Sequence, residues 1–129
     1  MAVQITAFYA ALTGFLMLVL AYRVVGFRRL FKAGMGDSDD HDFQVAIRAH
    51  ANLIEYAPLT LILLLCTEAS GMSVLWMHVL GAAFFLSRLA HAWGFLVARG
   101  AYHLGRFCGT LLNWILIAVL SVINMIAIV

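Results

Sequence analysis

Apolar stretches that are long enough to cross a lipid bilayer occupy nearly the whole of this chain. Of its 129 residues, 65% are hydrophobic and only 11% are charged, whereas a soluble domain carries about 25% charged residues. We expect four spans, at about residues 5–27, 43–68, 73–98 and 106–129, because a helix needs roughly 20 apolar residues to cross the hydrocarbon core. The composition predicts an all-α integral membrane protein, with one four-transmembrane-helix domain over residues 1–129.

The basic residues predict how these spans are oriented. Six of them flank the first and third connections: Arg23, Arg28, Arg29, Lys32, Arg99 and Arg106. The second connection, around Gly71, carries no lysine or arginine. Because loops rich in lysine and arginine stay in the cytoplasm, we expect both basic loops to be cytoplasmic and both termini to lie on the opposite side. In the first connection, Asp39, Asp40 or Asp42 is expected to cap the second span.

Composition and spacing argue against two classes of ligand. The net charge is only +2 and the basic residues are scattered, so we expect no nucleic-acid partner. The histidines lack metal-ligand spacing and the cysteines are not paired along the sequence, so we expect no metal. Cys66 and Cys108 lie in apolar stretches, where we expect them to be buried and not joined in a disulfide.

Four polar residues of the second span fall on one face of the predicted helix. At about 100° per residue, Arg48, Asn52, Glu55 and Tyr56 lie within an arc of roughly 100°. A charged side chain that faces lipid at the membrane centre costs about 2.5–3.5 kcal/mol. We therefore expect this stripe to face protein, water or a polar ligand, and ionisable residues at such depth indicate a functional site.

The third and fourth spans place further polar groups at a matching depth. Counting from the cytoplasmic ends of their spans, Glu55 should lie about 18 Å deep and Arg88 about 15 Å. We expect these two residues to form an ion pair, because each charge offsets the desolvation of the other. The prediction is a cytoplasm-facing polar pocket within the bundle, lined by Arg48, Asn52, Glu55, Tyr56, Arg88, His91 and Arg106.

The chemistry of this pocket indicates its ligand. Guanidinium groups favour carboxylates, and the carboxylate of Glu55 favours an ammonium group or an amide N–H. A ligand with both, reached from the cytoplasm, would be a small zwitterionic peptide or amino acid, and an opening toward lipid would admit an apolar second substrate. Taken singly, an Arg–Glu pair or a buried tyrosine is equally consistent with a structural role.

The residues 48–55, Arg-Ala-His-Ala-Asn-Leu-Ile-Glu, resemble the second-helix signature of the MAPEG family, membrane-associated proteins in eicosanoid and glutathione metabolism. The likeness continues through residues 76–78 and 87–91 of the third span, which are most similar to the prostaglandin E synthase branch. The resemblance implies a homotrimer that binds glutathione between subunits. In this interpretation Arg106 activates the thiol, and glutathione is bound by Arg48, Asn52, Glu55, Tyr56, Arg88 and His91.

Three functions remain open on the sequence. The first is a glutathione-dependent membrane enzyme, either a transferase or a lipid-hydroperoxide peroxidase, whose thiolate attacks a lipophilic substrate. The second is a non-catalytic protein that binds and presents lipids. It is favoured by Phe95 and Phe107, which replace a tyrosine and a serine found in other members. The third is a transporter or channel subunit, although the chain shows neither repeats nor broken helices of the kind transporters have.

Overall fold

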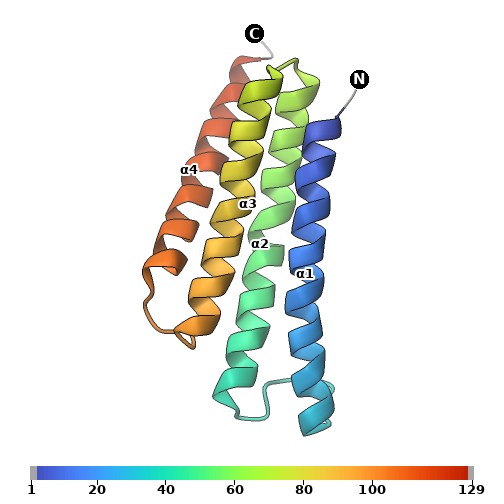
Figure 1. Cartoon of the computed structure of the whole chain (residues 1–129), viewed down its shortest axis with the longest axis vertical. Helices are drawn as coiled ribbons and strands as arrows, with labels where there is room; N and C mark the ends of the chain where they lie inside the picture. Colours follow the sequence, from blue (N-terminus) through green and yellow to red (C-terminus); the bar gives the residue numbers. More distant parts are fainter. Residues whose placement is uncertain (1–2, 128–129) are drawn as a thin grey trace.

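The computed structural model describes residues 3–127 as a bundle of four long helices that run alternately up and down (Figure 1). The helices are α1 Gln4–Phe31, α2 His41–Ala69, α3 Val74–Val97 and α4 Leu104–Ile126. Each is long and apolar enough to cross a membrane, which confirms the four predicted spans. The first helix continues a turn beyond its predicted end, and the predicted end of the fourth span, at Val129, lies outside the described residues.

The starts of α1 and α2 are capped by carboxylates. Asp40 accepts a hydrogen bond of 2.8 Å from the backbone N–H of Phe43, and is therefore the N-cap expected from the acidic connection. The start of α1 is capped by a distant residue, Glu68, which accepts from the N–H groups of Ile5 at 2.9 Å and Thr6 at 2.7 Å. Unpaired N–H groups are costly in a membrane, so Glu68 holds the start of α1 against the end of α2.

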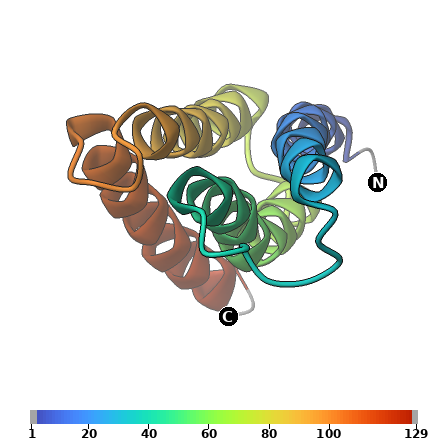
Figure 2. The same cartoon turned by 90° about the horizontal axis from the view of Figure 1, so that it is seen from below.

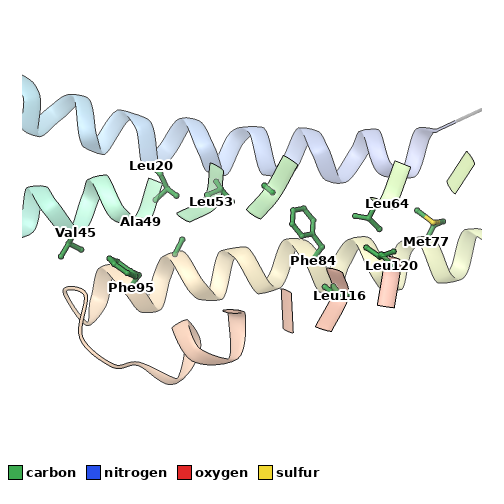
Figure 3. Close-up of a cluster of buried hydrophobic side chains, with 12 residues drawn as sticks. Leu20, Val45, Ala49, Leu53, Leu64, Met77, Phe84, Phe95, Leu116 and Leu120 are labelled. Atoms are coloured by element: carbon green, nitrogen blue, oxygen red, sulfur yellow. The ribbon is translucent and has the colours of Figure 1, made fainter. Parts of the chain in front are cut away.

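The four helices are not arranged as a symmetric square. Seen from one end, α1 and α4 lie on opposite sides of α2 (Figure 2), and both pack against α2 and α3. Side chains such as Leu20, Leu53, Phe84 and Leu116 fill the narrow space between the helices (Figure 3). Both basic connections lie at one end of the bundle, and the turn between α2 and α3 lies at the other (Figure 1).

The prediction that the cysteines are buried was wrong. Cys66 and Cys108 are both exposed on the surface of the chain. In a membrane bundle an apolar side chain packs as favourably against lipid as against another helix. Hydrophobicity therefore does not decide which side of a transmembrane helix faces the core.

The contact between α3 and α4 depends on Gly109. A Cβ added at this position would overlap the backbone carbonyl of Ser87 and lie 2.8 Å from the backbone nitrogen of His91. Small residues at such points let helix backbones approach closely in membranes. The close approach brings the main chain of α4 within reach of polar side chains on α3.

Replacing Gly109 by alanine should destabilise the bundle by about 1–3 kcal/mol, because backbone atoms of α3 cannot move aside as a flexible side chain could. Thermal unfolding in detergent micelles measures the effect. Gly14→Ala is the matched control, since an added Cβ there meets no atom within 4 Å and alanine favours the helix. Equal melting temperatures for the two variants would contradict this account of the helix contact.

Candidate functional site

Arg88 is the buried centre of the polar site. It lies in the middle of α3 and is only 2% exposed. Its Nη2 donates to the backbone carbonyl of Gly109 on α4 at 2.7 Å, and its Nη1 donates to Oδ1 of Asn52 on α2 at 3.4 Å. The guanidinium carbon also lies 5.5 Å from the ring centre of Tyr56. Because a buried cation needs partners for its donors, Arg88 ties three helices together.

The predicted ion pair between Glu55 and Arg88 does not form within the chain. Oε1 of Glu55 lies 3.6 Å from Nη1 of Arg48, two turns earlier on the same helix. The predicted depths matched, but depth does not fix the direction in which a side chain points. Packing turns Arg88 inward, toward Asn52 and Gly109, while Glu55 points away from the core.

The four polar residues of α2 follow one face of the helix, as predicted, but that face lies at the edge of the bundle. Asn52 and Tyr56 are half-buried beside Arg88, whereas the side chains of Arg48 and Glu55 are 55% and 51% exposed. The prediction of a single pocket inside the bundle was therefore wrong. A stripe that begins in the core and ends on the surface needs a second surface to enclose a ligand.

His91 and Phe95 lie on the same face of α3 as Arg88, toward the end with the basic connections. Both side chains are buried, and their ring centres are 5.8 Å apart. Phe95 also lines a cleft of about 410 Å³ together with Arg48 and Gln44 of α2 and residues 99–101 of the third connection. This cleft gives Arg48 a concave polar surface next to it.

Arg106 lies at the start of α4 and forms a separate part of the site. Its Nη1 donates to the backbone carbonyls of Gly100 and Ala101, and its guanidinium carbon lies 4.5 Å from the ring centre of Phe95. It lines its own cleft, of about 350 Å³, with four neighbours: Tyr102, His103, Phe107 and Thr110. Phe95 thus contacts Arg106 and also lines the cleft of Arg48.

Two partners of Arg88 were not predicted from the sequence: the carbonyl of Gly109, and the hydroxyl of Ser87, which lies 3.4 Å from its Nε. A main-chain acceptor leaves no signal in residue types, although a glycine facing another helix hints at it. No group of histidine, cysteine, aspartate and glutamate suited to a metal ion occurs within residues 3–127.

Replacing Arg88 by alanine should lower stability by about 2–4 kcal/mol, because Asn52 and the carbonyl of Gly109 lose a buried charged donor. Replacing Arg48, whose ion pair is half exposed, should cost less than about 1 kcal/mol. Chemical denaturation of both variants in micelles measures the difference. A larger loss for Arg48→Ala than for Arg88→Ala would contradict the assignment of Arg88 as the structural centre.

Comparison with known proteins identifies the family of this chain. A family model described as the MAPEG family matches residues 6–126. The inner membrane protein YecN, from two strains of Escherichia coli, is 33% identical over 92 residues, which cover 71% of this chain and 70% of YecN. Four membrane-length helices and these relatives together show an integral, multi-pass membrane protein. The chain belongs to the MAPEG family.

Proposed function

We propose that this protein is a glutathione-dependent membrane enzyme that activates the thiol for attack on a lipophilic substrate. The observation that carries the proposal is the half-exposed Arg48–Glu55 pair, which lies within the membrane-length helix α2 next to the buried network of Arg88. Membership of a family with glutathione-dependent members supports it. Conjugation to an electrophile or reduction of a hydroperoxide would both begin from the same thiolate.

The α2 stripe suits the charges of glutathione, a tripeptide with two carboxylates and one ammonium group. The guanidinium of Arg48 is a two-pronged donor for a carboxylate, and Glu55 is an acceptor for the ammonium group. Their mutual ion pair is long, at 3.6 Å, and half exposed. Such pairs contribute only about 0–1 kcal/mol, so a ligand can replace their contact at small cost while the Arg88 network keeps the helices in place.

We propose that a second copy of the chain covers this stripe, as part of a homotrimer. Against lipid, each exposed charge would cost about 2.5–3.5 kcal/mol at the membrane centre. A neighbouring subunit removes Arg48 and Glu55 from lipid and supplies the missing wall of the site. Glutathione would then lie between subunits, with Arg48 and Glu55 holding its charged groups, Asn52 and Tyr56 beside them, and the buried Arg88 and His91 supporting the site from behind.

Arg106 is proposed to stabilise the thiolate. A free thiol has a pKa of about 8.5, and a nearby cation lowers it. A guanidinium remains charged at every relevant pH, so the thiol proton goes to solvent rather than to or from Arg106. The basic connections are proposed to face the cytoplasm, which is where glutathione would enter.

The lipophilic substrate is proposed to arrive from the membrane. An apolar groove of about 310 Å³ runs between α1 and α2, and Leu53, Ile54 and Pro58 form part of its wall. At about 100° per residue, this wall lies mostly on the opposite face of α2 from Arg48 and Asn52, with Pro58 as its nearest member to Glu55. Pro58 cannot donate to the carbonyl of Ile54, which leaves a polar atom of the main chain near this wall.

Glutathione should bind to the purified protein, and both Arg48→Ala and Glu55→Gln should weaken binding by at least about tenfold, since each removes a charge-assisted contact of about 1.5–3 kcal/mol. Calorimetry in micelles measures the affinities. Glu68→Gln is the matched control, because it makes the same change on α2 but at the end where Glu68 caps α1. Absence of binding to the wild type at millimolar glutathione would refute the proposed function.

Native mass spectrometry should detect an assembly of three chains, because three copies can cover all three stripes of Arg48 and Glu55 in a closed ring. Substituting an exposed residue of the α2 stripe with a bulkier one, as in Glu55→Trp, should shift the population toward single chains. An equivalent change on the outer face of α1, Tyr22→Trp, serves as the control. A wild type that remains a single chain under all mild detergent conditions contradicts the shared site.

A non-catalytic lipid-binding function is the second candidate, and Phe95 favours it. This buried ring lies under the guanidinium of Arg106 and has no hydroxyl group to bind a ligand. On this alternative the protein binds lipid, shows no thiolate in its bound glutathione and turns over no electrophile. The ultraviolet absorbance of the thiolate distinguishes the two functions. If it is present in the wild type and absent in Arg106→Ala, it supports the enzyme.

A further inference from the structure

We propose that Asp42 and Arg99 form a positioning pair that sets the orientation of Arg106. Nε of Arg99 donates to Oδ1 of Asp42 at 2.7 Å, and the backbone carbonyl of Arg99 accepts from Nε2 of His41 at 2.8 Å. Arg99 belongs to the third connection, and its two partners form the first turn of α2. Arg99 therefore attaches the third connection to α2 through both its side chain and its backbone carbonyl.

The attachment continues directly to Arg106. The two carbonyls that follow Arg99 in the chain, those of Gly100 and Ala101, both accept hydrogen bonds from Nη1 of Arg106. Any displacement of Arg99 must move these carbonyls, because they are covalently adjacent to it. A continuous path of contacts therefore runs from Asp42 through Arg99 to the guanidinium of Arg106.

The backbone at Arg99 adopts a conformation that external contacts help to hold. Arg99 has φ of 50° and Gly100 has φ of 82°, so both adopt the left-handed region. Glycine adopts it readily, whereas an arginine there is strained and persists only where surrounding contacts hold it. Asp42 and His41 provide those contacts. Main-chain hydrogen bonds to residues 95, 96 and 98 also hold this turn, so loss of the Asp42 and His41 contacts should loosen the carbonyls that hold Arg106 while α3 stays intact.

Orientation matters because only part of the guanidinium is available to a ligand. Arginine has five N–H donors in a rigid plane, and the two on Nη1 are directed to Gly100 and Ala101. The ring of Phe95 covers one face of the guanidinium. Within residues 3–127, Nη2 and Nε have no protein acceptor, and the pair decides where these donors point.

This role differs from a contribution to stability. The side chains of Arg99 and Asp42 are 64% and 45% exposed, and exposed ion pairs add little to folding free energy. Removing either partner should leave the bundle folded. The proposal rests on the proposed function of Arg106, and it adds that two residues outside the α2 stripe control how effectively the thiol is activated.

Asp42→Asn and Arg99→Gln test the proposal in the full-length protein. For Asp42→Asn, calorimetry should give a dissociation constant for glutathione within about twofold of wild type, because the α2 stripe is unchanged and Asp42 does not line the cleft beside Arg48. At neutral pH the thiolate absorbance of bound glutathione should fall by about fivefold or more, because a displaced guanidinium lets the thiol pKa return toward about 8.5. Arg29→Gln, at an exposed arginine at the same end of the bundle, is the control and should change neither reading.

The charge-swapped double variant, Asp42→Arg with Arg99→Asp, should recover at least about half of the lost thiolate signal, because it rebuilds the pair. Amide hydrogen exchange of residues 98–103, measured without glutathione, should be faster in both single variants and slower again in the double variant. Unchanged exchange, or normal thiolate in both single variants, overturns the positioning role alone. A wild type that binds no glutathione overturns the proposed function, and this role with it.

Discussion

A guanidinium buried inside a membrane helix bundle is the constraint on which this structure depends. Arg88 cannot reach water from the middle of α3, so its donors must find acceptors within the chain. It finds them on both neighbouring helices, at Asn52 and at the carbonyl of Gly109. The second acceptor is accessible only because α4 carries a glycine where the two backbones meet. The position of α4 and the burial of Arg88 therefore require each other.

The buried polar groups hold the helices together, whereas the exposed polar groups are available to bind a ligand. Around Arg88 the charge is shielded and its partners are fixed, so there is little to exchange with a ligand. Within the described part of the chain, Arg48 and Glu55 pair only with each other, at 3.6 Å and with half of each side chain exposed. Binding requires groups whose present contacts are weak enough to replace. The candidate site is therefore centred on Arg48 and Glu55, next to the network of Arg88.

Much of the fold could be predicted from the sequence, but the site only in part. The spans follow from hydrophobic length, because backbone N–H and C=O groups must be paired within each helix in lipid. The shared face of Arg48, Asn52, Glu55 and Tyr56 follows from helical periodicity alone. The pairing of Glu55 with Arg88 does not, because counting residues gives depth along a helix but not its rotation. Cys66 and Cys108 were misplaced for a related reason, since lipid accepts apolar side chains as readily as the core does.

The amino-acid sequence by itself determined that this chain crosses a membrane four times, that polar groups share one face of the second helix, and which family it resembles. Only the tertiary structure decided which of those polar groups are buried, that Arg106 is held by the third connection, and that Asp42 and Arg99 attach this connection to α2. The physical reason is that helix formation in lipid is governed by local hydrogen bonding and length. The rotation and contact of the helices depend instead on packing between residues far apart in the chain.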